Sequence, residues 1–358
     1  MSEYSRKLEI IRAWMADHKV GGLYLQTVGS FAWATCGASS YINTASTNGL
    51  AALLITQDMK YLVTTNIEAP RLELEQGLAA QGWESVIFPW YESHDAVADL
   101  YRGLKLASDS PYPGAVDLSA ELARLRAKLT PEEGDRFRAL GKSCAQAVKN
   151  ATGTVRPGQT EYEIASRLAF EAEKQGVQAI VNLIATDERI YSYRHPLPTA
   201  KKLDRYAMLI LCGRRAGLIC SLTRLVHFGP LPDELRQKAA GCAKVDAEFI
   251  KSTRPGRTLG EIFENAISAY AAQGFPGEWQ KHHQGGASGY EPREYLALPA
   301  SVDRVSAGQA YAWNPSITGY KSEDTILVGE DHNEILTEMP DWPVTVVDGI
   351  ARPMILVL

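Results

Sequence analysis

The side chains with the clearest capacity for acid–base chemistry are His195 and Glu323. His195 lies in a His-Pro-Leu-Pro segment, and an imidazole with a pKa near ~6.5 can accept and return a proton around neutrality. Glu323 lies in KSED (321–324), where a carboxylate can hold a substrate cation through charge-assisted hydrogen bonds or orient a water molecule. The structural alternatives are a loop histidine that caps the next strand and a glutamate in a salt bridge, for example with Arg224. We predict that both are catalytic and face a solvated pocket.

A second group of polar side chains follows in the chain. His282 and His283 precede Gln-Gly-Gly, where glycine lets the backbone approach a ligand closely, although a hydrogen-bonded structural pair is the alternative. Arg293 is flanked by Tyr290 and by an acidic residue. Together with Arg194 and Arg224, Arg293 makes an anionic substrate group such as a carboxylate the favoured ligand, unless these arginines are only solvated.

An internal repeat indicates how these residues are positioned. RPGQTEYEIASRLAFEAEKQG (156–176) matches RPGRTLGEIFENAISAYAAQG (254–274), and each copy follows an amphipathic segment, 131–150 or 232–251. The Pro-Gly pair forces a turn, and the threonine two residues after the glycine begins a capping box with the glutamate three residues later. Two helices followed by strands, twice over, predict a pseudo-two-fold module in which helices cover a curved sheet.

The first ~125 residues have the pattern of a separate α/β domain. Apolar residues at helical spacing predict a helix over 4–18, and β-rich runs at 22–27, 50–56, 61–65 and 85–89 predict strands. Thr130-Pro131-Glu132-Glu133 then has the form of a capping box with proline at the first helical position. We place the domain boundary just before it, near Leu129.

Four segments carry a family resemblance: YRHPLPTAKKL (193–203), CGRRAGLICSLTR (212–224), HHQGGASGY (282–290) and WNPSITGYKSED (313–324). In order and spacing they resemble the creatinase/aminopeptidase P family, also called the M24 or pita-bread family. The resemblance covers roughly 130–350 well and 1–125 loosely. It implies an α/β (α+β) protein with a small creatinase-like N-terminal α/β domain, 1–128, and a pita-bread catalytic domain with the pseudo-two-fold repeat, 129–358.

Members of that family that bind metal use two aspartates, one histidine and two glutamates. The resemblance places these five ligands, in order, at Leu211 (or Ile210 if a deletion lies elsewhere), Ser221, Gly286, Asn314 and Glu323. One carboxylate, one amide and one hydroxyl do not hold two divalent ions. We therefore predict no metal and no other cofactor.

The resemblance also implies roles for the remaining polar residues. Creatinase, a metal-free hydrolase of this fold, has its proton-transfer histidine at the position of His195, and its matching glutamate, at Glu323, holds the guanidinium group of its substrate. His282 falls on an accessory active-site histidine of aminopeptidase P. The predicted catalytic residues are thus His195 and Glu323, and the predicted substrate-binding residues are His282, His283, Arg293, Tyr290, Asn314, Arg194 and Arg224.

Composition excludes several classes of function. The chain has 358 residues, a formal net charge of −5 and no basic stripe, so no nucleic-acid partner is predicted. No apolar run is long enough to cross a membrane and no signal-peptide pattern begins the chain. Five cysteines without a CxxC pair are typical of buried thiols in a reducing cytoplasm. By analogy with the family, we expect a cytoplasmic homodimer that acts on a small molecule.

The leading hypothesis is a metal-independent, creatinase-like hydrolase that cleaves a C–N bond of a small polar substrate through acid–base catalysis by histidine. One alternative is a divergent Xaa-Pro aminopeptidase, a metallopeptidase that kept enough ligands to bind one ion. The other is a catalytically inactive ligand-binding or assembly protein of the same fold. A fold does not determine which of these is right, because function depends on the site.

Overall fold

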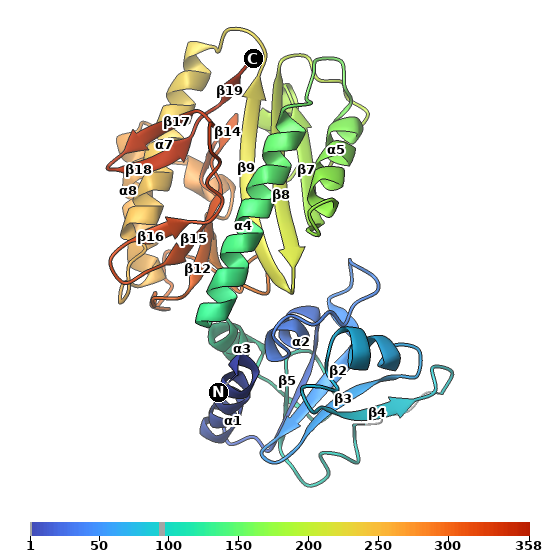
Figure 1. Ribbon diagram of the computed structural model, residues 1–358. Helices are drawn as coiled ribbons and strands as arrows, with labels where there is room; N and C mark the ends of the chain where they lie inside the picture. The colour runs from blue at the N-terminus through green and yellow to red at the C-terminus, as the bar shows by residue number, and fades with distance from the viewer. Residues whose placement is uncertain (1, 93–96) are drawn as a thin grey trace. The chain divides into compact units, whose positions relative to one another are not determined.

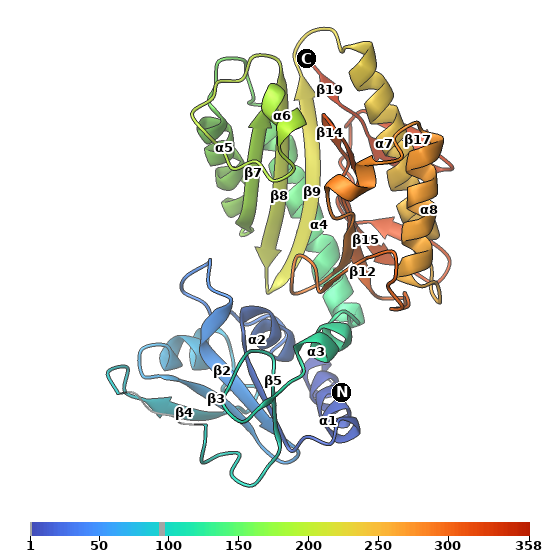
Figure 2. The same cartoon turned by 180° about the vertical axis from the view of Figure 1, so that it is seen from behind.

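The computed structural model describes residues 2–92 and 97–358, and it divides into two compact units (Figures 1 and 2). The first unit comprises 1–126 with 216–218, and the second comprises 127–215 with 219–358. No helix in the described part of the chain is both long and apolar enough to cross a membrane.

The N-terminal unit is built on a six-stranded sheet in the order β4-β3-β2-β1-β5-β6. Its strands are β1 (Gly22–Thr27), β2 (Asn48–Thr56), β3 (Lys60–Thr65), β4 (Glu84–Phe88), β5 (Leu106–Ser108) and β6 (Val116–Asp117). Its helices are α1 (Glu3–Asp17), α2 (Val28–Ala34), a short helical turn (Arg71–Glu75) and α3 (Ser119–Arg126). The helix predicted over 4–18 and the four predicted strands are confirmed as α1 and β1 to β4.

The C-terminal unit contains two successive sets of helices and strands, as the repeat predicts. The first set comprises α4 (Pro131–Thr152), α5 (Glu161–Glu173), β7 (Gln178–Thr186), α6 (Glu188–Ser192), β8 (Tyr206–Arg215) and β9 (Leu218–His227). The second comprises α7 (Asp233–Ser252), α8 (Leu259–Ala272), a 3₁₀ turn (Glu278–Lys281), β10 (Gly285–Ser288), β11 (Tyr295–Leu296), β12 (Ala310–Trp313), β13 (Ser316–Ile317), β14 (Tyr320–Lys321) and β15 (Asp324–Val328). The chain ends with β16 (Asn333–Ile335), β17 (Val344–Val347), β18 (Ile350–Pro353) and β19 (Leu356–Val357).

The repeat is confirmed in its hydrogen bonds. Thr160 and Thr258 both begin complete capping boxes, with Glu163 and Glu261 as the reciprocal partners, and Thr130 does the same for α4. The glycine of each Arg-Pro-Gly turn has φ of +88°, a conformation that glycine adopts without strain. The amide of Gly158 donates to the Leu203 carbonyl at 2.8 Å, and the amide of Gly256 donates to the Val305 carbonyl at 2.9 Å. Each turn is therefore fixed to the equivalent segment of its own half.

Two sheets carry the site residues of this unit. One sheet has the order β19-β9-β8-β7, and α4 and α5 pack on it (Figures 1 and 2). The other sheet has the order β11-β10-β12-β15-β16. Its β12 contacts α7, which packs against α8. An isolated antiparallel bridge between Thr223 and Glu323 connects them. The pita-bread fold class predicted from the sequence is confirmed, and its two halves meet at one of the predicted catalytic residues.

Candidate functional site

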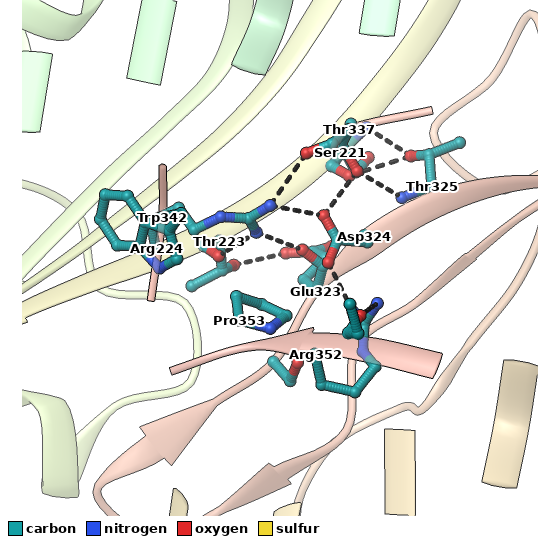
Figure 3. Close-up of polar contacts among 12 residues, drawn as sticks. Ser221, Thr223, Arg224, Glu323, Asp324, Thr325, Thr337, Trp342, Arg352 and Pro353 are labelled. Carbon is teal, nitrogen blue, oxygen red and sulfur yellow. Dashed lines mark hydrogen bonds and ion pairs between the residues drawn. The ribbon is translucent and has the colours of Figure 1, made fainter. Parts of the chain in front are cut away.

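The seam between the two sheets fixes the backbone around Glu323. The Thr223 amide donates to the Glu323 carbonyl at 3.1 Å. Beside this bond, the Ser221 amide donates to Thr325 Oγ1 at 2.9 Å, and that hydroxyl donates to the Ser221 carbonyl at 2.9 Å (Figure 3). Because Glu323 lies on a short link between β14 and β15 and is bonded to β9, its side chain has a defined direction.

The Glu323 carboxylate is enclosed by cationic and hydroxyl donors. Thr223 Oγ1 donates to Oε2 at 2.6 Å, Lys321 Nζ lies 2.8 Å from the same oxygen, and Arg293 Nη2 donates to Oε1 at 3.2 Å. Glu323 is 2% exposed. Burial alone would raise the pKa of Glu323, but Lys321 and Arg293 lower it to about 2. The expectation that Glu323 faces a solvated pocket is therefore wrong, because both of its oxygens are enclosed by protein donors.

Lys321 is a site residue that the sequence analysis did not single out. Its side chain is only 5% exposed, which is rare for a lysine and is explained by the carboxylate beside it. The spacing of Lys321 and Glu323 could have indicated this contact, because residues i and i+2 of an extended segment point to the same side. A lysine two positions before a candidate catalytic glutamate, in a buried strand, was the available clue.

Asp324 is directed into a second ion network, separate from the Glu323 side chain (Figure 3). Arg224 Nη2 donates to Asp324 Oδ1 at 2.8 Å and to the Thr337 carbonyl at 2.9 Å, and Arg352 also pairs with Asp324. Arg352 is fully buried and also pairs with Asp246 at 2.6 Å. Arg224 is 2% exposed. Its predicted role in binding substrate is therefore wrong in this structure, and its carboxylate partner is Asp324 rather than Glu323.

Three histidines lie together near Glu323, Lys321 and Arg293, which act electrostatically on His195. His195 follows α6, and His282 and His283 follow the 3₁₀ turn. His195 Nε2 and His282 Nε2 are 3.1 Å apart, and the rings of His282 and His283 stack with centroids 4.4 Å apart. The structure thus brings together residues 87 positions apart that the sequence analysis had placed in one site.

All three imidazoles are held in the neutral form at pH 7. Burial and Lys321 lower the pKa of His195, and Glu323 opposes them less strongly. Burial, followed by the cations, lowers the pKa of His282 to about 2 and that of His283 to about 4. A neutral imidazole can accept a proton or coordinate a metal through its free nitrogen. These shifts also place Lys321, Arg293 and Glu323 within electrostatic reach of His195.

Two other residues predicted to bind substrate, Arg194 and Tyr290, make their hydrogen bonds and ion pairs with residues other than Glu323. Arg194 Nη2 lies 3.2 Å from Glu278 Oε2 and donates to Thr318 Oγ1 at 2.9 Å. The Tyr290 hydroxyl donates to Glu133 Oε1 at 2.5 Å, and the side chain is 1% exposed. Glu133 closes the capping box of α4, so Tyr290 supports that helix end rather than offering its hydroxyl to a ligand.

The five positions that the family resemblance assigns to metal ligands do not fit a two-ion centre. Glu323 already pairs with two cations. A Cβ at Gly286 would lie 2.2 Å from the Tyr295 carbonyl oxygen, so this backbone has no room for any side chain there. Asn314 is 1% exposed, and its Oδ1 has no hydrogen-bond partner in the described part of the chain. One amide oxygen and one paired carboxylate are too few donors for two dications.

The first aspartate position is corrected by strand alternation. Ser221 Oγ donates to Cys212 Sγ at 3.3 Å, so Cys212 and Ser221 share one face of the β8–β9 hairpin. Leu211 therefore points to the opposite face, and Ile210, the other position considered, points to the same face as Cys212. Burial raises the pKa of the Cys212 thiol to about 11, so it is protonated at pH 7 and is no ready anionic ligand.

A cavity of about 970 Å³ lies elsewhere in the C-terminal unit, against α4, the end of α7 and the C-terminal hairpins. None of the predicted catalytic or substrate-binding residues lines it. The chemistry of the histidine and ion groups, rather than cavity size, identifies the candidate site.

Comparison with known proteins gives a consistent family relationship. Residues 135–330 match the sequence model described as Metallopeptidase family M24. The chain is 28% identical over 210 residues to an uncharacterized peptidase of Staphylococcus epidermidis, and this match covers 56% of the chain and 58% of that relative. It is 23% identical over 316 residues to a Xaa-Pro dipeptidase of Lactobacillus helveticus, covering 78% of the chain and 84% of that protein.

Among solved structures, the Xaa-Pro dipeptidase from Bacillus anthracis superimposes with a TM-score of 0.81 at 18% identity. The match covers 99% of this chain and 100% of that one. At this identity the likeness establishes the fold, and the activity has to be argued from the site.

Proposed function

The chain belongs to metallopeptidase family M24, and we propose that it hydrolyses the amide C–N bond of a small, carboxylate-bearing substrate of dipeptide size without the family's two-ion centre. The names of the relatives, which include Xaa-Pro dipeptidases, support an amide bond rather than the guanidino group of a creatinase substrate. The lack of fit between the five ligand positions and two ions supports a mechanism that relies on protein groups.

The observation that carries the proposal is the charge of the group around Glu323. Lys321 and Arg293 contribute two positive charges and Glu323 one negative charge, and burial and these cations keep the three histidines neutral at pH 7. The group therefore has a net charge of +1, which favours an anionic group of the substrate or an oxyanion that forms during the reaction. In this proposal Glu323 is a positioning residue that holds two cations, in place of the substrate contact predicted from the sequence.

His195 supplies the proton transfer. Its neutral imidazole accepts a proton from water as the water oxygen bonds to the carbonyl carbon, and returns a proton to the nitrogen as the C–N bond breaks. The side chain is exposed, whereas His282 is 9% exposed, so His195 is the member of the group that a substrate reaches first. His282 orients it through the 3.1 Å contact between the two Nε2 atoms.

A substrate panel tests this function. Chelator-treated protein is incubated with dipeptides and N-acyl amino acids, each beside an analogue with an amidated C-terminus, and products are measured by mass spectrometry. We expect hydrolysis of one or more free acids and little or none of the amidated analogues. Equal hydrolysis of both forms would remove the carboxylate from the proposal. Saturable binding without any product would favour the inactive ligand-binding alternative.

A further inference from the structure

The three histidines form a cluster that the hydrolytic proposal does not fully use. One ring nitrogen each of His195, His282 and His283 lies within 4.8 Å of the other two. None of these residues occupies one of the five metal-ligand positions of the family. A proton-transfer mechanism needs one imidazole and one orienting partner, which leaves His283 without a role.

The spacing of the nitrogens suits one ion. Zinc binds histidine nitrogen at about 2.0–2.1 Å, so two such ligands at a tetrahedral angle lie roughly 3.3–3.4 Å apart. The two Nε2 atoms of His195 and His282 are 3.1 Å apart. A ring nitrogen of the partly exposed His283 lies within 4.8 Å of ring nitrogens of both other histidines and is the candidate third ligand, and exposed His195 leaves the fourth position open to solvent.

Two further ring nitrogens in the cluster lack a partner. Nδ1 of His282 and Nδ1 of His283 are buried and make no hydrogen bond to any residue that the structure describes. His282 is nine-tenths buried, and leaving a buried polar nitrogen unsatisfied costs about 1–3 kcal/mol. The contact between the Nε2 atoms of His195 and His282 leaves both Nδ1 atoms unsatisfied, and an ion that takes Nδ1 of His283 as its third ligand satisfies one of them. Three neutral imidazoles close together are, in contrast, a ligand set that zinc and similar borderline ions accept.

The charges around the cluster limit its affinity. Lys321 and Arg293 repel a dication, and Glu323 attracts it, as their effects on the histidines indicate. The net effect is unfavourable, so we expect a site weaker than a structural zinc site. The occupancy of such a weak site changes with the concentration of the free ion.

We propose that His195, His282 and His283 bind one divalent ion of the zinc class, and that this ion inhibits the hydrolase. The inhibition rests on the proposed function, because an ion on Nε2 of His195 displaces the orienting contact with His282 and makes the imidazole a weaker base. The binding itself does not depend on it.

The binding is measured first, without substrate. Chelator-treated protein is titrated with Co²⁺, followed by its visible absorption, and with Zn²⁺ by calorimetry. We expect one ion per chain. We expect His195→Ala, His282→Gln and His283→Asn each to lower the affinity by at least about 100-fold, the upper end of what losing an outer-shell partner costs. The control, His332→Ala, changes an exposed loop histidine and should bind like the wild type.

Failure of the ion site and failure of the hydrolase are distinguishable. Absence of a cobalt band and of saturable heat, or equal binding by the three variants, overturns the ion site and leaves the hydrolase proposal untouched. If a substrate is found, Zn²⁺ should lower turnover and chelator should restore it. Binding without inhibition overturns the regulatory role alone. Circular dichroism of each variant ensures that only folded protein is compared.

Discussion

Replacement of His195 by alanine should lower kcat by about 10²–10⁴-fold, the usual contribution of a positioned general acid–base group. KM should change little, because in this account the cations near Glu323, rather than His195, hold the substrate. Steady-state kinetics on the substrate found in the panel measures both quantities. The matched control is His332→Ala, which removes an exposed imidazole outside the site and should keep wild-type kinetics.

The pH profile provides the second readout of the same prediction. A general base works only when unprotonated, so kcat/KM should rise with pH through the pKa of His195 and then level off. Because burial and Lys321 lower the pKa of His195 below its ordinary value of 6.5, this limb should lie on the acid side of 6.5. The limb should be absent from the residual activity of the variant. Wild-type rates in His195→Ala would remove this residue from the mechanism.

Replacement of Glu323 by glutamine should destabilise the fold by about 3–5 kcal/mol, the typical cost of removing one partner from a buried ion group. The substitution keeps the shape but leaves Lys321, which is 5% exposed, and Arg293 without their counter-charge. Chemical denaturation measures the loss. This expectation reverses the one that follows from a solvated Glu323, and it arises entirely from the burial that the structure reveals.

Two controls separate this effect from a general sensitivity to the substitution. Glu234→Gln makes the same change in an exposed carboxylate that pairs with Lys238, and it should change stability little. Lys321→Met in the Glu323→Gln background should recover part of the loss, as a double-mutant cycle for a coupled pair requires. A small effect of Glu323→Gln with no coupling to Lys321 would mean that the buried ion group does not form.

The pH dependence of stability follows from the same group. The pKa of Glu323 is about 2 in the folded protein and 4.5 without the fold. A depressed pKa contributes stability that is fully present above the unfolded value and is lost as the pH falls toward the folded value. Wild-type stability should therefore fall between about pH 4.5 and 2 more steeply than that of Glu323→Gln.

The elements of the fold could be predicted from local chemistry. The capping boxes at Thr130, Thr160 and Thr258 are complete in the structure, because their hydrogen bonds involve residues only three positions apart. The repeat followed from the same signals. The bridge between Thr223 and Glu323 joins residues a hundred positions apart, and no local pattern contains it.

The sequence indicated which residues form the site, but not the directions in which their side chains point. The family resemblance assigned His195, His282, His283, Arg293 and Glu323 to one site, and contacts between neighbouring members of this set are present in the structure. The errors concern which way a side chain points. Leu211 lies on the wrong face of its strand, Arg224 is buried on Asp324, and Tyr290 bonds the end of α4. These outcomes depend on register and on partners distant in sequence. The homodimer and the cytoplasmic location stay predictions.

The proposed activity is amide hydrolysis without the family's two-ion centre. The most direct test compares turnover of the best panel substrate by chelator-treated protein with turnover after Mn²⁺ is added, with metal content measured on the same samples. We expect full turnover in chelator and no stimulation by Mn²⁺. Turnover that appears only with added Mn²⁺, at one or two bound ions per chain, would contradict this and favour the metallopeptidase alternative.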